Sequence, residues 1–201
     1  MKSELLKRIL SSIILIPIAF FFVIKGSFYF NFFIFICFLV AAYEWHKMKK
    51  KNIHFYSGLF FLIFSFYTVY ICRIEDYILF TLVLITCIAT DIGGYIFGKI
   101  FKGPKLIKIS PNKTYSGMIG GFFTSIISAN FFLHYTPSDS DIELPGKMSI
   151  EIFVFVILIS LVSQIGDLII SYFKRLSKVK NTGKIIPGHG GLLDRIDGMI
   201  F

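Results

Sequence analysis

Long apolar stretches, separated by short polar segments, run through almost the whole chain. A helix needs roughly 20 apolar residues to cross about 30 Å of hydrocarbon. Six stretches meet this requirement, at about residues 9–26, 27–44, 57–73, 77–98, 117–135 and 150–172. The pattern therefore predicts an all-α fold, a polytopic membrane helix bundle, in which residues 1–201 form a single integral-membrane domain.

Composition also places the chain in a bilayer. The chain is 55% hydrophobic, contains 25 Phe, has a mean hydropathy of +0.75 and is only 16% charged. It is too apolar to be a soluble domain of 201 residues. Basic residues precede the first stretch, as they precede a signal peptide, but that stretch is long and no Ala-x-Ala-like cleavage site follows it. We therefore expect it to be a retained helix.

The basic residues predict the orientation of the spans. If six spans alternate, all but three of the 21 Lys and Arg fall on the side that holds both termini; the exceptions are Lys25, Arg73 and Lys147. The positive-inside rule then puts both termini in the cytoplasm, with the protein in the inner membrane of the cell. The net charge of +9 is spread over four segments of this face. Anionic membrane lipids and phosphate substrates explain it better than nucleic acid, which we do not expect as a partner.

Three acidic residues, Asp91, Asp167 and Glu44, lie inside or at the edge of apolar spans. A carboxylate near mid-membrane costs about 2.5 to 3.5 kcal/mol, so each needs a partner or a wet cavity. Glu44 closes the second span beside Trp45, where a buried salt bridge or an interfacial position explains it as well as a function does.

Asp167 is a stronger candidate for function because of the residues that follow it. Ser171, Lys174 and Arg175 stand at i+4, i+7 and i+8 from Asp167, so all four share one helical face. Snorkelling toward the membrane surface explains the two cations without any function. It does not explain an aspartate one turn deeper than the serine.

The C-terminal segment from Ser171 to Asp197 combines cations, carboxylates and glycines. Its Lys and Arg side chains can bind phosphate, and the glycines around His189 predict a tight loop whose amides can approach an anion. Asp167, Asp194 and Asp197 supply the hard oxygen ligands that Mg²⁺ prefers. This combination suggests phosphoryl or nucleotidyl transfer at a membrane surface.

A second polar segment follows the fourth span. Its lysines are explained equally well by membrane anchoring and by phosphate binding. We expect a compact turn here that cradles a triphosphate, formed by Ser110, Pro111, Lys113 and Thr114. The small residues at 117 and 121 predict a close helix contact instead.

These residues carry a resemblance to the CDP-diacylglycerol synthases, the phosphatidate cytidylyltransferases. The family's C-terminal signature is matched by Ser171, Lys174, Arg175, Lys180, Gly183, Pro187, Gly188, His189, Gly190, Gly191, Asp194, Arg195 and Asp197. Its other polar blocks are matched by Asp91, Tyr95, Gly98, Lys99, Ser110, Pro111, Lys113, Thr114, Gly117, Gly120, Gly121, Gly166 and Asp167. The similarity covers roughly residues 80–201 and is weaker before them.

Two features depart from the family. Asn181 stands where the signature has aspartate, which keeps a hydrogen-bonding side chain but removes a negative charge. The chain also stops at Phe201, where a further membrane helix usually begins, so we expect either a short protein or one that lacks a final C-terminal helix.

The resemblance implies that CTP reacts with phosphatidate to give CDP-diacylglycerol and pyrophosphate for phospholipid synthesis. It implies Mg²⁺ as the cofactor, with a second cation in a paired centre held by Asp167, Asp194 and Asp197. The expected catalytic residues are Asp167, Asp194, Lys174, Arg175, His189 and Ser171. The expected substrate-binding residues are Lys113, Ser110, Thr114, Arg195, Lys180 and Asp91.

Other functions remain alternatives at this point. Asp91 and Asp167 would suit the ion pathway of a transporter, although transport does not explain the dense C-terminal segment. A CDP-alcohol phosphotransferase would need an Asp-Gly-x-x-Ala-Arg pattern, which is absent. An inactive homologue of the synthase is a third alternative because of Asn181. Small-residue helix faces would also suit a homodimer.

Overall fold

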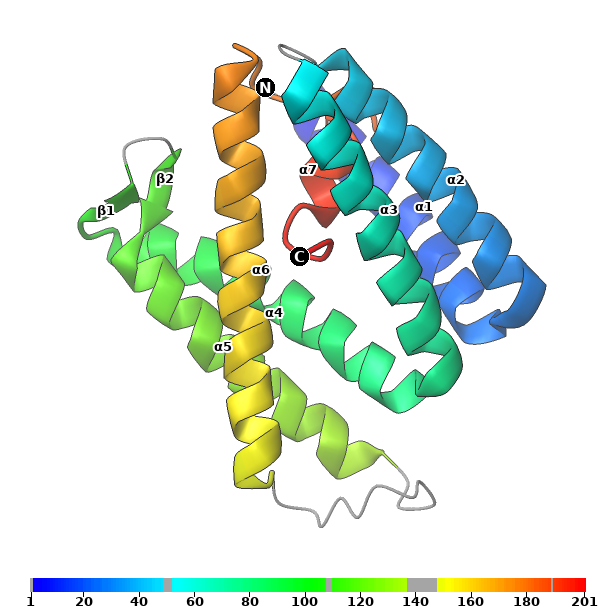
Figure 1. Cartoon of the computed structure of the whole chain (residues 1–201). Helices are drawn as coiled ribbons and strands as arrows, with labels where there is room; N and C mark the ends of the chain where they lie inside the picture. Colours follow the sequence, from blue (N-terminus) through cyan, green and yellow to red (C-terminus); the bar gives the residue numbers. More distant parts are fainter. Residues whose placement is uncertain (1, 49–51, 108–109, 137–147, 189) are drawn as a thin grey trace. The chain divides into compact units, whose positions relative to one another are not determined.

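The computed structural model describes residues 2–48, 52–107, 110–136, 148–188 and 190–201. Helices dominate it (Figure 1). They are α1 (Lys2–Lys25), α2 (Ser27–Lys47), α3 (Asn52–Glu75), α4 (Tyr77–Phe101), α5 (Tyr115–Tyr135), α6 (Ile150–Leu176) and the short α7 (Leu193–Ile196). Two short strands, β1 (Lys105–Ile107) and β2 (Ser110–Thr114), complete the described elements.

The predicted all-α membrane bundle is confirmed as a fold class. Helices long and apolar enough to cross a membrane, by length and composition, cover Ser27–Lys47, Phe55–Glu75, Tyr77–Phe101, Tyr115–Tyr135 and Ile150–Leu176. A shorter apolar helix covers Ile13–Lys25, within the first predicted span. The count of six spans and the cytoplasmic position of both termini remain predictions.

Residues at the helix boundaries explain where the helices begin. Gly26 separates α1 from α2 with a φ of 62°, a left-handed conformation that glycine adopts readily. Asp76 caps the N-terminus of α4, and its Oδ1 accepts hydrogen bonds from the amides of Ile78 and Leu79 at 2.8 and 2.9 Å. Thr114 caps α5 in the same way, accepting from the Gly117 amide at 3.1 Å.

The chain forms two compact units. The first contains Met1–Ile71 and Phe173–Ile200, and the second contains Cys72–Tyr172 with Phe201. The first unit includes α1, α2, α7 and most of α3; the second includes α4, α5, the hairpin and most of α6.

In the second unit, α4 and α5 pack closely through glycines. A Cβ on Gly93 would lie 2.6 Å from the Gly120 carbonyl oxygen, and one on Gly117 would lie 2.7 Å from that of Gly94. A Cβ on Gly121 would lie 3.1 Å from the Thr90 carbonyl oxygen on α4, which is also a tight contact. The predicted small-residue contact at positions 117 and 121 is therefore confirmed, and it lets the two backbones approach directly.

Helix α6 joins this pair through apolar and hydroxyl contacts. Val156 packs with Leu82, Ala129 and Leu133 in a buried cluster. The hydroxyls of Thr90 and Ser160, both almost fully buried, lie 2.8 Å apart. Such a bond between helices helps to join them where no water competes.

The polar segment between α4 and α5 differs from its prediction. Ser110–Thr114 is a strand rather than a compact turn, and it pairs antiparallel with β1. Lys105 lies opposite Thr114, and Ile107 lies opposite Ser110. The reason is that β1 supplies pairing partners for the backbone of residues 110–114, whose Ser-Pro-Asn composition alone is typical of a turn.

Candidate active site

In the first unit, the part of the C-terminal signature that lies between α6 and α7 folds as a tight loop. Ile186 and Gly190 exchange both backbone hydrogen bonds, at 2.9 and 3.1 Å. Gly188 and Gly190 have φ values of 77° and 93°, which explains the need for glycine at both positions. The predicted tight loop is confirmed, whereas His189, a predicted catalytic residue, lies outside the described residues.

Lys174 joins the two carboxylates at the end of this segment. Its Nζ lies 2.9 Å from Asp194 Oδ1 and 3.5 Å from Asp197 Oδ2. All three side chains are nearly buried, with exposed fractions of 11%, 5% and 12%. Lys174 therefore does not snorkel away from the helix end; it neutralises charge inside the protein.

Asp194 is held mainly by donors from its own loop. Its Oδ2 accepts hydrogen bonds from the backbone amides of Thr182 (2.8 Å) and Gly191 (3.0 Å) and lies 3.2 Å from Thr182 Oγ1. A Cβ on Gly190 would lie only 2.7 Å from the same oxygen. Oδ2 is thus filled, and Asp194 can offer a further ligand only through Oδ1, where Lys174 binds.

Glu44, at the end of α2, lies against the same loop. Its carboxylate is completely buried and accepts hydrogen bonds from the amides of Leu192 and Leu193, each at 2.9 Å. The Thr182 hydroxyl lies 2.9 Å from Glu44 Oε2. Among the described residues these donors are amides and a hydroxyl rather than a cation, so a buried salt bridge does not describe Glu44, whereas its interfacial position remains a prediction.

We call Glu44, Lys174, Thr182, Asp194 and Asp197 the signature cluster. The sequence predicted Lys174, Asp194 and Asp197 as site residues but no role for the other two. Glu44 could have been identified from its position at the end of an apolar span, because a carboxylate buried there needs several hydrogen-bond donors. Thr182 gave no such signal.

The second unit contains a separate ion pair. Lys113 on β2 binds Asp167 on α6 through its Nζ and the carboxylate Oδ2, and both side chains are about one quarter exposed. Ser110 is half-buried on the same strand. The hydroxyl of Thr114 caps α5 and lies 3.0 Å from Ser116 Oγ, so it is already engaged within the protein. Asp91 is exposed on α4.

The remaining predicted residues of the first unit lie toward the surface. Arg175, Lys180 and Arg195 are exposed. Arg175 donates to the Val179 carbonyl oxygen at 3.4 Å, a long and weak bond. The exposed cations near the signature cluster can therefore meet anions from outside, in contrast to Lys174.

Helix α6 carries Asp167, Ser171, Lys174 and Arg175 without interruption, so the helical spacing that the sequence predicted is present. Ser171 is half-buried.

The carboxylates suit a hard cation, although the described residues form no ready cluster of three or more His, Cys, Asp or Glu side chains. Asp167 is partly exposed, and Asp194 retains lone pairs on Oδ1. Oxygen ligands of this kind are the ones that Mg²⁺ prefers. In this structure an ammonium group pairs with each of Asp167, Asp194 and Asp197, and a divalent cation would have to displace it or share the carboxylate with it.

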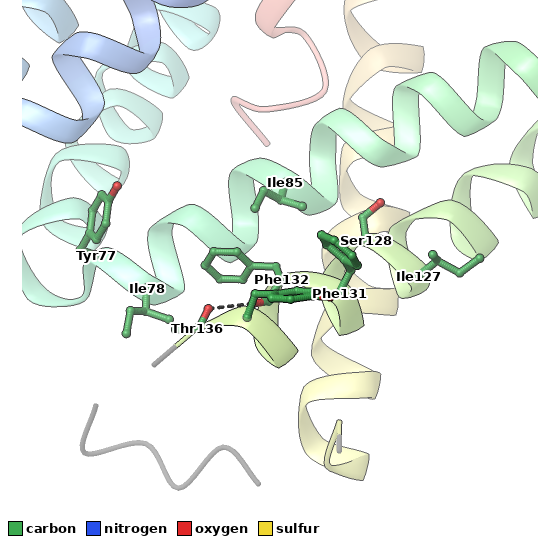
Figure 2. Close-up of a pocket in the computed structure, with 9 residues that line it drawn as sticks. Tyr77, Ile78, Ile85, Ile127, Ser128, Phe131, Phe132 and Thr136 are labelled. Atoms are coloured by element: carbon green, nitrogen blue, oxygen red, sulfur yellow. Dashed lines mark hydrogen bonds between the residues drawn. The ribbon is translucent and has the colours of Figure 1, made fainter. Parts of the chain in front are cut away.

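An apolar groove in the second unit has a different character (Figure 2). It has a volume of about 750 Å³ and is lined by residues of α4 and α5 together with Thr136. Its lining includes Ile85, Phe131 and Phe132 but no charged side chain. The Thr136 hydroxyl donates to the Phe132 carbonyl at 2.8 Å, as drawn in Figure 2. The groove is therefore unsuited to nucleotide phosphates.

Comparison with known proteins identifies the family. A family model described as the cytidylyltransferase family matches residues 6–77 and 73–201. A phosphatidate cytidylyltransferase of Rickettsia conorii is 34% identical over 206 residues, covering 99% of this chain and 88% of the relative. Enzymes of the same name from Staphylococcus aureus and Brucella suis are 41% and 37% identical, over 73% and 72% of this chain.

The chain spans about half the length of these last two relatives, 52% in each case. The family model, by contrast, covers almost all of the chain and includes both the signature cluster and the Lys113–Asp167 pair. With this coverage and these residues, the chain belongs to the cytidylyltransferase family.

Proposed function

We propose that the protein is a phosphatidate cytidylyltransferase, an enzyme that converts CTP and phosphatidate into CDP-diacylglycerol and pyrophosphate. Membership of the cytidylyltransferase family and similarity to relatives with that name support this activity. The single structural observation that supports it best is the signature cluster, in which a buried ammonium binds two of the three carboxylates beside a glycine loop. Such a group keeps opposite charges in balance and would hold the glycine loop and its carboxylates in place beside the exposed cations that bind phosphate.

The reaction balances without an added base or oxidant. A phosphate oxygen of phosphatidate forms a bond to the α-phosphorus of CTP, and the bond from that phosphorus to the bridging oxygen of the β-phosphate breaks. The electron pair leaves with pyrophosphate. Because nucleophile and electrophile are both anionic, the barrier comes mainly from their repulsion and from charge on the leaving group.

The chain's cations are proposed to reduce that repulsion. Arg175, Arg195 and Lys180 are exposed in the first unit and would bind phosphate oxygens. Lys174 would hold Asp194 and Asp197 in place from the buried side. His189 in the glycine loop is proposed as a further phosphate contact, and Ser171 as a supporting hydroxyl.

In the second unit, Lys113 is proposed to bind CTP phosphate, with Ser110 on the same strand. Thr114 would contribute less than the sequence suggested, because its hydroxyl caps α5. Asp91 is proposed to provide a polar wall. Asp167 would direct the ammonium of Lys113 through their ion pair.

Mg²⁺, with a second cation, is the proposed cofactor, and Asp167, Asp194 and Asp197 would supply its oxygen ligands. When bound, it would neutralise phosphate charge and stabilise the leaving pyrophosphate. Asp194 would contribute through Oδ1, since its Oδ2 is filled by loop donors.

We propose that the catalytic residues face the cytoplasm of a cell whose inner membrane holds the protein. Charge asymmetry supports this orientation. Lys47 lies over the Tyr43 ring and Lys99 faces the Tyr95 ring, at 4.4 and 5.6 Å from the ring centres. Arg73 likewise lies over the Tyr77 ring, at 4.3 Å, on the side expected outside. Such pairs are typical of both ends of membrane spans, so they support the span ends and not the orientation. We also propose that the protein associates with membrane lipids. Formation of a homodimer would be tested by measuring the mass of the protein in detergent.

The test is an assay of the purified protein in detergent, with CTP labelled on its α-phosphate, phosphatidate and Mg²⁺. Formation of labelled CDP-lipid is expected, together with one pyrophosphate per turnover. Absence of the product from folded protein over a range of Mg²⁺ concentrations would contradict the proposal and favour an inactive homologue. Replacing phosphatidate with diacylglycerol is the control, since the lipid then lacks the attacking phosphate.

A further inference from the structure

We infer that Glu44 and Thr182 are positioning residues, which hold the loop at residues 182–193 so that Asp194 meets Lys174. The inference rests on the proposed function. Glu44 lies on α2, far from the signature segment in sequence, yet its carboxylate binds both ends of that loop.

The groups around Glu44 are hydrogen-bond donors that match its acceptor oxygens. An ionised carboxylate only accepts hydrogen bonds. The amides of Leu192 and Leu193 can only donate, and the Thr182 hydroxyl is able to. Because Glu44 has no exposed surface, water cannot replace a donor that is lost. Glutamine at this position would turn an N–H group toward one of these donors.

The loop backbone fits closely around the Glu44 carboxylate. A Cβ on Gly183 would lie 2.6 Å from Glu44 Oε1, and one on Gly191 would be closer still to Oε2. Two glycines of the signature therefore leave space for Glu44. The shape of the loop is matched to this side chain and is not determined by local turn chemistry alone.

Thr182 connects Glu44 to the charged residues of the signature cluster. Thr182 lies between two carboxylates, with its Oγ1 at 2.9 Å from Glu44 and 3.2 Å from Asp194. The Thr182 amide also donates to Asp194 at 2.8 Å. Asp194 in turn binds Lys174 at 2.9 Å. A continuous series of hydrogen bonds thus runs from the end of α2 to the end of α6, within one unit.

The experiment compares Glu44→Gln and Thr182→Val with two controls. Thr182→Ser keeps the hydroxyl, and Glu151→Gln changes an exposed carboxylate at the start of α6. Deuterium exchange by mass spectrometry would follow the peptide that contains the Leu192 and Leu193 amides. The catalytic constants would be measured on the folded fraction, with CTP varied.

We expect faster exchange in the loop for Glu44→Gln and Thr182→Val, while Thr182→Ser and Glu151→Gln behave as wild type. The kcat should fall by about tenfold or more, since misplacement of catalytic groups by about 1 Å has effects of this order. The KM for CTP should change by less than about threefold, because the exposed cations remain. A purely structural role would reduce the yield of folded enzyme and leave kcat per folded molecule unchanged.

Wild-type exchange and wild-type kcat in both Glu44→Gln and Thr182→Val would overturn the inference. The inference would also be overturned if Thr182→Ser lost as much kcat as Thr182→Val. If Glu44→Gln does not fold, Thr182→Val carries the test by the same measurements. A wild-type protein that forms no CDP-lipid would contradict the proposed function instead, and loop exchange in the variants would still decide whether Glu44 and Thr182 hold the loop.

Discussion

Lys174 serves two carboxylates at once, and this arrangement makes it sensitive to substitution. Asp194 and Asp197 are nearly buried, so removing the ammonium leaves two negative charges together without solvent. Breaking a buried ion pair by deleting one partner costs about 3 to 5 kcal/mol. The loss comes mainly from the charge that is left behind.

Replacing Lys174 with Met is therefore expected to destabilise the protein by about 3 kcal/mol, because Asp194 loses its ammonium partner. The thermal unfolding midpoint in detergent would measure the effect. Adding Asp194→Asn should restore part of the stability but none of the activity, since one negative charge is removed with the lysine. Lys184→Met, at an exposed lysine, is the matched control. An additive loss in the double variant would contradict this account.

Asn181, which stands where the family signature has aspartate, lies beside the proposed metal ligand Asp194. It flanks Gly190 together with Asp194, since a Cβ on Gly190 would lie 3.3 Å from Asn181 and 2.7 Å from Asp194 Oδ2. Asn181→Asp would add a negative charge at an exposed position beside the proposed metal ligands. One added negative charge there should make the free energy of Mg²⁺ binding more favourable by roughly 1 kcal/mol. The Mg²⁺ concentration for half-maximal activity should therefore fall about fivefold.

Titrating Mg²⁺ at saturating CTP would test this prediction, with Asn181→Ala as the control for side-chain loss. An Asn181→Asp enzyme that needs the same or more Mg²⁺ would show that the departure from the family signature does not limit metal binding.

At the residue scale, the sequence predicted the charged members of the site better than their partners. Lys174, Asp194 and Asp197 stand out in an apolar chain because charge is costly there. Their partners are recognised only in three dimensions, since Glu44 binds amides 148 and 149 residues further along. The functions of Lys113 and Asp167 were predicted separately, but nothing in their spacing indicated that they pair.

At the element scale, the glycines between α4 and α5 replace side chains as the packing surface. The α4 backbone carbonyls of Thr90 and Gly94 lie where a side chain on α5 would have to go. A backbone atom in the middle of a helix cannot move aside as a flexible side chain can. The two helices thus form a rigid base for the hairpin between them.

Gly117→Val is expected to disrupt this packing, because its Cβ would lie 2.7 Å from the Gly94 carbonyl oxygen. Overpacking of this kind typically costs about 1 to 3 kcal/mol. The unfolding midpoint should fall, whereas Ile119→Val, on an exposed position of α5, should leave it nearly unchanged. Equal midpoints for the two variants would show that α4 and α5 can separate without cost.

The helices were predicted more accurately than the hairpin. Apolar stretches of about 20 residues indicate helices directly, because a membrane span must satisfy the hydrogen bonds of its own backbone groups. The strand Ser110–Thr114 depends instead on pairing with Lys105–Ile107, and neither segment alternates apolar and polar residues. Its formation is decided by neighbours, which local composition does not reveal.

At the scale of the whole molecule, the distribution of charge predicts a membrane orientation. The hairpin segment and the C-terminal segment are both rich in lysine, and the positive-inside rule puts them on the same side of the membrane. The start of α6, with Glu151, should lie on the opposite side.

Single-cysteine labelling would test this orientation in right-side-out vesicles, after replacement of Cys37, Cys72 and Cys87. A membrane-impermeant maleimide should label Glu151→Cys in intact vesicles, because that end of α6 is expected outside. Lys105→Cys, at an exposed position of β1, should react only after permeabilisation. Labelling in the reverse order would contradict the orientation.

The distance along the chain between Glu44 and its donors also has a consequence during biosynthesis. Leu192 leaves the ribosome 148 residues after Glu44. At about 5 to 20 residues per second, the wait is roughly 7 to 30 seconds. Until Thr182, Leu192 and Leu193 have been made, the carboxylate lacks these loop partners and must stay hydrated, so the end of α2 can become dry only after residue 193 has been synthesised. Insertion of the early helices therefore precedes assembly of the site, and a stalled nascent chain would carry an unprotected acid at its membrane boundary.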